Sequence, residues 1–176
     1  VYLNQWLAER GYLTWTRSVA ESLEDIAAGT KAFVMDPARV YVNLKGKFPL
    51  GSVEPADYRA VRDELKREMA AIEVDGVRVI DQVLEKEEIF SGANLDLAPD
   101  LCLLPVRGYD LKGAVNKTVL ADRDVFTGMH TRDDALFWIG NRSARDGDAT
   151  IYDVAPTILA SLGLEPAPTM DGRSFL

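Results

Sequence analysis

The chain of 176 residues has very few of the side chains that build crosslinks and metal sites. It contains one cysteine, Cys102, and one histidine, His130. A single cysteine excludes an intramolecular disulfide and a cysteine-rich zinc site. One histidine cannot build a catalytic metal site, because such sites take several protein ligands. A catalytic metal centre that used His130 would therefore need ligands that this chain lacks.

The chain also lacks a long apolar run, a basic cluster and internal repeats. No stretch is long enough to span a bilayer, so no membrane contact is expected. The net charge of −8 argues against nucleic acid as a partner, because phosphate binding needs a basic patch. The mixed charges of 59–68 are typical of a solvated helix face. The chain begins with Val1 and shows no signal peptide, so we expect a piece of a longer protein, with a cytoplasmic location as the default.

The length and an apolar content of 47% suit one domain, or a fragment of one, over residues 1–176. Apolar residues at helical spacing predict helices, which cover 3–7, 19–27, 55–72 and 154–162. Short β-prone runs predict strands, which cover 32–35, 40–43, 77–84, 101–104 and 135–139. An Asp-Pro turn joins the first two strands as a hairpin. Helices mixed with short strands predict an α/β or α+β sheet protein.

Local signals refine these elements. Ser18 and Glu21 fit a capping box that would open the helix over 19–27. Asp153 can cap the helix over 154–162, which would bury Val154, Ile158, Leu159 and Leu162. Bulky aromatic side chains favour the core or an interface, and this expectation covers Trp6, Trp15 and Trp138.

A few residues could carry chemistry. His130 follows Gly128 and precedes an expected strand, and a ligand placed there would be held rigidly, as metal geometry requires. The alternative is a structural or surface histidine. Asn43 and Lys45 could approach a substrate phosphate or simply shape a loop. Adjacent acids near a loop are either extra metal ligands or solvated charges, and this choice applies to Asp133 and Asp134. Asp153 is explained by helix capping, and we expect a structural role at the tail for Asp171 and Arg173. We expect Cys102 to be a small buried apolar side chain.

Several ordered blocks of the chain resemble the C-terminal region of the alkaline phosphatase superfamily, with the type I phosphodiesterase/nucleotide pyrophosphatase group as the nearest branch. The blocks run from the first residues to the tail and comprise Leu3–Leu13, Val40–Gly46, Glu88–Gly92, Ala98–Leu101, Gly128–His130, Asp153–Leu164 and Met170–Arg173.

The resemblance implies an α/β fold: the C-terminal portion of an alkaline-phosphatase-like sheet flanked by helices, with a smaller α+β insertion. It implies a complete enzyme that hydrolyses small phosphate esters with two divalent metal ions, expected to be zinc, and His130 as one metal ligand. The nucleophile and the other ligands lie upstream in the family. This chain alone is therefore expected to be inactive and to bind no metal tightly.

Two departures and several alternatives stay open. The family often has glycine where this chain has Asp134, and a Gly-Pro turn where it has Gly140-Asn141. The chain could instead be a non-catalytic binding or scaffold domain, or belong to a related phosphatase, sulfatase or phosphoglycerate mutase branch. An excised half of a sheet would also expose strand edges, which predicts a homodimer through such an edge.

Overall fold

The structure is a computed structural model that describes residues 1–35, 37–123, 125, 135–140, 145 and 147–176. The chain divides into two compact units, Val1–Met129 (unit 1) and His130–Leu176 (unit 2). Helices and an antiparallel sheet occur together, which confirms a mixed α/β protein. Within the ranges given above, no helix is long and apolar enough to cross a bilayer.

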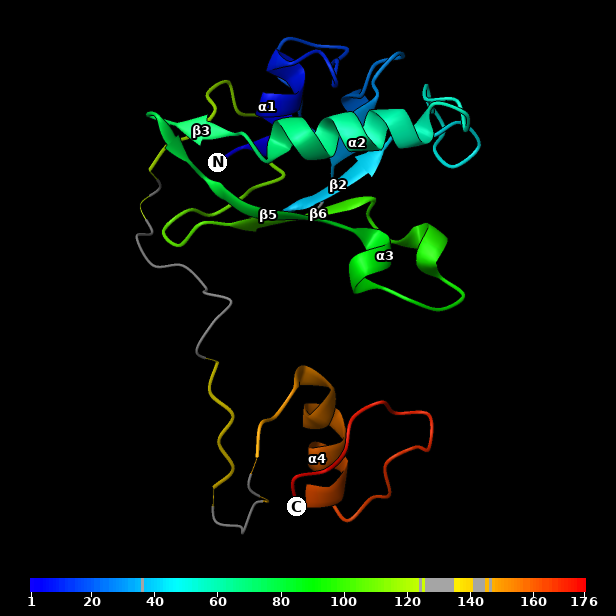
Figure 1. The fold of residues 1–176 in the computed structure, drawn as a ribbon, viewed down its shortest axis with the longest axis vertical. Helices are drawn as coiled ribbons and strands as arrows, with labels where there is room; N and C mark the ends of the chain where they lie inside the picture. The colour runs from blue at the N-terminus through cyan, green and yellow to red at the C-terminus, as the bar shows by residue number, and fades with distance from the viewer. Residues whose placement is uncertain (36, 124, 126–134, 141–144, 146) are drawn as a thin grey trace. The chain divides into compact units, whose positions relative to one another are not determined.

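Unit 1 is built on a four-stranded antiparallel sheet with the strand order β1-β2-β6-β5 (Figure 1). These strands are β1 (Ala32–Val34), β2 (Arg39–Val42), β5 (Ile80–Glu85) and β6 (Leu101–Pro105). Phe33 lies opposite Tyr41, so the predicted hairpin is confirmed. Leu101 then pairs with Val40, which brings the later strand β6 beside β2. The predicted strand over 101–104 is therefore confirmed as an interior strand of the sheet.

The strand predicted over 77–84 forms in two pieces. A small hairpin of β3 (Glu73–Val74) and β4 (Val77–Arg78) comes first, and β5 starts at Ile80. Between the pieces, the Val79 backbone N–H donates to the carbonyl of Ile72 at 3.0 Å. That bond ties the strand to the end of the preceding helix, and the chain turns from the hairpin into the main sheet there.

The described residues of unit 1 form three helices: α1 (Leu3–Glu9), α2 (Tyr58–Met69) and α3 (Lys86–Ile89). Both longer helices were predicted, and α1 contacts β1 while α2 contacts β5 and β2. Helix α2 packs its apolar stripe inward, since Leu65 and Met69 are fully buried. These side chains meet the buried face of the sheet, which includes Val40, Leu101 and Leu103.

The side chain of Asn4 closes one edge of the sheet. Its Nδ2 donates to the carbonyl of Val34 at 2.9 Å, and its Oδ1 accepts from the Val34 N–H at 2.8 Å. The Ala32 N–H donates to the carbonyl of Tyr12 at 3.2 Å. These bonds use backbone groups that an open edge would present to another chain. Strand β5 is the other edge strand of the sheet.

The helix predicted over 19–27 is wrong. Only a 3-10 turn, η1 (Leu23–Asp25), forms there, and its capping box uses Ser22 and Asp25 rather than Ser18 and Glu21. The Asp25 carboxylate accepts from the N–H of Glu21 at 2.8 Å. A side chain that binds backbone N–H groups in this way competes with helix formation. A second 3-10 turn, η2 (Leu95–Leu97), lies later in unit 1.

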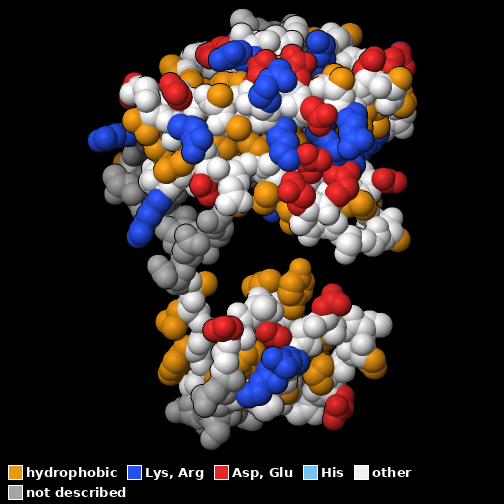
Figure 2. All heavy atoms as spheres, viewed as in Figure 1, with side chains coloured by type: hydrophobic (Ala, Val, Ile, Leu, Met, Phe, Trp, Pro, Cys, Tyr) orange, Lys and Arg blue, Asp and Glu red, His pale blue; other side chains and the backbone are white. Residues whose placement is uncertain are grey.

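Unit 2 contains the 3-10 turn η3 (Ile151–Asp153) and the predicted helix as α4 (Val154–Ser161). The face predicted to be buried is wrong in part: Ile158 is 54% exposed and Leu162 is 69% exposed, whereas Val154 and Leu159 are half-buried. Pro156 and Thr157 are buried instead. The C-terminal tail packs beside Thr157, whose hydroxyl accepts from the Phe175 N–H at 3.1 Å. The side of α4 that is buried is therefore the side that the tail covers. Hydrophobic side chains remain on the surface of unit 2 (Figure 2).

The strand predicted over 135–139 is also wrong, because residues 135–140 form no strand. Trp138 in that segment is 79% exposed, so it does not lie in a core, and the interface alternative stays a prediction. Trp6 is 3% exposed and confirms the expectation for the core of unit 1, and Trp15 packs against that core partly buried.

Candidate functional site

The predicted metal ligand, His130, lies outside the described residues, as do Gly128, Asp133 and Asp134. In the part of the chain that the structure describes, no three His, Cys, Asp or Glu side chains are placed to hold a metal ion. The assignment of His130 as a metal ligand stays a prediction from the sequence.

The loop that follows β2 holds the two residues considered for phosphate binding. Asn43 is 2% exposed, and its Nδ2 donates to the carbonyls of Thr30 and Leu50, each at 2.8 Å. Both amide hydrogens are thus used inside the protein, so Asn43 shapes the loop and has no free donor for a substrate. Lys45 is exposed and forms an ion pair with the exposed Glu54. Of the two candidates, only Lys45 is on the surface.

Asp100 joins several elements of unit 1. The sequence indicated it only as a member of the motif block 98–101. It is 1% exposed, and its Oδ2 accepts from the Val42 N–H at 2.8 Å. Its Oδ1 accepts from the Tyr58 hydroxyl at 2.6 Å and from the Lys86 ammonium at 3.1 Å. Asp100 therefore connects β2, α2 and α3. An acid directly before a short apolar strand was the available signal for this role.

The electrostatics of this cluster fit its hydrogen bonds. Burial, together with the hydrogen bond to Asp100, raises the pKa of Tyr58. Burial by itself would lower the pKa of Lys86, but the hydrogen bonds to Tyr58 and Asp100 outweigh it and the pKa is raised. The phenol stays neutral and the amine stays charged near neutral pH, so the ion pair is maintained.

A second charged network lies beside the first. Arg62 binds Glu85 at 2.8 Å and Glu87 at 2.9 Å, and Lys66 binds Glu85 at 2.7 Å. Acidic and basic side chains are interspersed over this part of unit 1 (Figure 2). Arg62 is only 5% exposed, so the helix face expected to be solvated is partly buried. Its Nε has no hydrogen-bond partner among the described residues.

In unit 2, two separate motif blocks are joined by hydrogen bonds. Asp153 was predicted to cap α4, but its carboxylate instead accepts from the N–H of Thr150 and of Arg173, each at 2.8 Å. The backbone bond from Arg173 and the bonds from Thr150 lower the pKa of Asp153. Gly172 passes so close to Tyr152 that a Cβ would lie 1.9 Å from its carbonyl oxygen. The aspartate and the glycine thus fix the tail against the start of α4.

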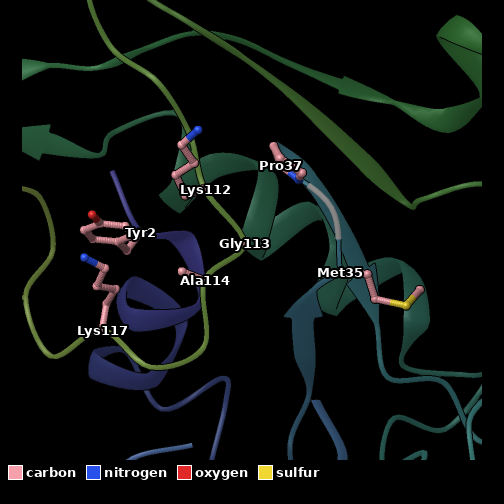
Figure 3. Close-up of a pocket in the computed structure, with 7 residues that line it drawn as sticks. All are labelled: Tyr2, Met35, Pro37, Lys112, Gly113, Ala114 and Lys117. Atoms are coloured by element: carbon pink, nitrogen blue, oxygen red, sulfur yellow. The ribbon is translucent and has the colours of Figure 1, made fainter. Parts of the chain in front are cut away.

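Unit 1 also has a pocket of about 370 Å³, and its residues come from three segments. Its lining consists of Tyr2, Met35, Pro37, Lys112, Gly113, Ala114 and Lys117. Tyr2 and Lys117 lie together on one side, Met35 and Pro37 lie on the other, and Gly113 and Ala114 lie between them (Figure 3). None of these residues was singled out from the sequence, because the segments are distant in the chain.

The lysines of the pocket are held by neighbouring carboxylates. Lys117 Nζ lies 3.1 Å from Asp122 Oδ2 and 4.5 Å from the centre of the Tyr2 ring. The Tyr2 hydroxyl donates to the other oxygen of Asp122. The hydrogen bonds to Tyr2 and Asp122 raise the pKa of Lys117, so its ammonium stays charged. Lys112 Nζ lies 2.6 Å from Asp110.

No protein-family model, curated protein or solved structure matches the chain. The functional proposals therefore depend on the residues of this chain and on their contacts.

Proposed function

We propose that the chain is the C-terminal part of a metal-dependent phosphodiesterase of the alkaline phosphatase superfamily. In the complete enzyme, His130 would supply one metal ligand, and the described residues would form supporting structure. Two divalent ions in such an enzyme activate a nucleophile and bind phosphoryl oxygens. The nucleophile and the other ligands would come from upstream sequence, so this chain alone would be inactive.

One observation supports the proposal. Residues in the motif blocks make contacts that another residue type could not make. In unit 2, Asp153 and Thr157 accept hydrogen bonds from the backbone of Arg173 and Phe175, and the space at Gly172 admits no Cβ. These contacts join the block 153–164 to the block 170–173. The two blocks resemble the family and also bind each other. Such a resemblance supports a common fold better than matches between surface residues that make no contacts.

Unit 1 adds the same kind of support. The carboxylate of Asp100, in the block 98–101, accepts from the Val42 N–H in the block 40–46. Lys86, which also binds Asp100, lies just before the block 88–92. Two blocks that are separate in the sequence thus meet at one carboxylate, which also binds a residue just before a third block. This arrangement supports the α+β part of the proposed fold, in which these blocks form one supporting unit.

The proposal is tested by restoring the upstream sequence. The chain alone should not hydrolyse an aryl phosphodiester with zinc, and calorimetry should find no tight zinc site. A longer protein that includes an upstream Asp-His-Gly-type metal motif should be active, and His130→Ala should lower that activity. Asp96→Ala is the matched control, because Asp96 is an exposed side chain of unit 1. Zinc-dependent hydrolysis by the 176-residue chain alone would contradict the proposal.

A second candidate function is a non-catalytic binding domain. The pocket of unit 1 favours it, because all seven lining residues lie within this chain. The reading frame discriminates the two candidates: a start codon directly before Val1 would favour the binding domain, and an upstream metal motif would favour the enzyme.

We also propose that any homodimer uses the β5 edge of the sheet. Asn4 and Tyr12 already bind backbone groups along β1, which leaves β5 as the alternative edge strand. Gel filtration should then show a dimer that a proline at Gln82, an exposed position of β5, abolishes. An unchanged elution volume of Gln82→Pro, with the fold retained, would contradict this mode of pairing.

A further inference from the structure

Among the described residues that line it, the pocket of unit 1 presents positive charge to a ligand. Two ammonium groups, from Lys112 and Lys117, line it, and no described lining residue is acidic. Their partners Asp110 and Asp122 are not among the lining residues. The carboxylates thus hold the lysines in place from outside the pocket. A cavity lined by one sign of charge attracts a ligand of the opposite sign.

The backbone of Gly113 and Ala114, which line the pocket, also offers hydrogen-bond donors. The carbonyl of Lys112 accepts from the Leu3 N–H at 3.0 Å, and the carbonyl of Gly113 accepts from Asn4 Nδ2 at 2.9 Å. The N–H groups of Gly113 and Ala114 donate no hydrogen bond to any residue that the structure describes. The Lys112 and Gly113 oxygens are used, whereas no described residue accepts from the Gly113 and Ala114 N–H groups, so this backbone suits an anion better than a cation.

The remaining wall is apolar. Met35 is 45% exposed, and Pro37, Ala114 and the ring of Tyr2 complete this surface. Figure 3 places Met35 and Pro37 across the pocket from Tyr2 and Lys117. A ligand that filled the pocket would contact the ammonium groups and the N–H groups with one part, and Met35 and Pro37 with another. The volume of about 370 Å³ is within the range of small-molecule sites.

We propose that this pocket binds a small molecule that joins one oxyanion group, a phosphate or a carboxylate, to an apolar body. The oxyanion accepts from the Gly113 and Ala114 N–H groups and lies near Lys112 and Lys117. The apolar body lies against Met35 and Pro37. This site is independent of the proposed hydrolase activity, because it needs neither His130 nor upstream residues.

The proposal is tested on the 176-residue chain by titration with three probes, monitored by the amide NMR signals of Gly113 and Ala114. The probes are phenyl phosphate, benzoate and inorganic phosphate. We expect at least one of the two aryl probes to bind with a Kd of about 1 mM or tighter, as is usual for ligands of this size. Phenyl phosphate should bind more tightly than inorganic phosphate, because only the aryl ester contacts the apolar wall. Comparison of the two aryl probes distinguishes a phosphate site from a carboxylate site.

Matched variants locate the site. Lys112→Glu should weaken binding by about tenfold or more through charge reversal, whereas Lys112→Arg should retain it. Met35→Asp should also weaken binding, and Met35→Leu should not. Both positions are exposed side chains, so folding should be retained, and the dispersion of the amide spectrum checks this. Lys47→Glu, a charge reversal elsewhere in unit 1, controls for net charge.

Three results would overturn the proposal. The first is that no aryl probe shifts the Gly113 and Ala114 signals at about ten times the expected Kd. The second is unchanged affinity in a folded Lys112→Glu variant. The third is equal binding of inorganic phosphate and both aryl probes, because it would leave no role for the apolar wall.

Discussion

Replacing Asp100 with alanine removes an acceptor that two buried donors and one partly buried donor share. The Val42 N–H, the Tyr58 hydroxyl and the Lys86 ammonium would all lose their partner. A buried neutral donor without a partner costs about 1–3 kcal/mol, and breaking a buried ion pair costs about 3–5 kcal/mol. The side chain of Lys86 is 11% exposed, so water can reach it in part. The three contributions do not add, because the donors share one carboxylate and Tyr58 is partly exposed. We therefore expect the free energy of unfolding to fall by about 4 kcal/mol, a large share of the total for a small domain.

Urea unfolding of the whole chain measures this change, with the buried Trp6 as a fluorescence probe of unit 1. Asp100→Asn keeps an oxygen acceptor but removes the charge opposite Lys86, so its cost should be smaller, about 2 kcal/mol. Asp96→Ala alters an exposed acid of the 3-10 turn η2 and should change stability by less than about 0.5 kcal/mol. If Asp100→Ala cost under about 1 kcal/mol, the reasoning that buried donors depend on this carboxylate would be refuted.

Three further predictions concern other contacts of the two units. The pKa of Asp153 is lowered by the Arg173 and Thr150 hydrogen bonds, so its contribution to unit 2 is complete above about pH 4. That contribution is lost as the pH falls through the lower folded-state pKa, and an NMR titration of the carboxyl should show a midpoint below the ordinary aspartate value. Gly172→Ala should destabilise unit 2 by about 2 kcal/mol in thermal unfolding, because its Cβ would overlap the backbone of Tyr152; Asp171→Ala, at an exposed neighbour, should not. Asn4→Ala should cost unit 1 about 3 kcal/mol and open the β1 edge, which analytical ultracentrifugation would detect as self-association; no loss of stability would contradict the role of Asn4.

Local patterns predicted the elements whose partners are close in the sequence. The hairpin of β1 and β2 has a turn-forming Asp-Pro between two β-prone runs, and α2 has an apolar stripe at helical spacing, so both were found. The helix expected over 19–27 failed because the Asp25 side chain binds local backbone N–H groups, which periodicity alone does not reveal.

The contacts that define the sites depend on residues far apart in the chain. Asp100 binds Val42 and Tyr58, and the pocket joins Tyr2, Met35 and Lys112. Sequence spacing carries little information on contacts between distant residues, because these contacts depend on how strands pair and helices pack. The buried side of α4 was likewise decided by the tail that lies against Thr157, and not by the apolar pattern of the helix.

The sequence by itself determined the mixed α/β class, several elements and the exclusion of a disulfide, because these depend on composition and local pattern. It also determined the motif blocks on which the proposed hydrolase depends, and His130 remains a prediction from those blocks alone. Only the tertiary structure decided that Asn43 is buried with both amide hydrogens bonded inside the protein. It also decided that Asp100 and Asp153 each hold separate blocks together, and that two lysines line the same pocket. The physical reason is that hydrogen bonding and burial are properties of neighbours in space, which a chain acquires only when it folds.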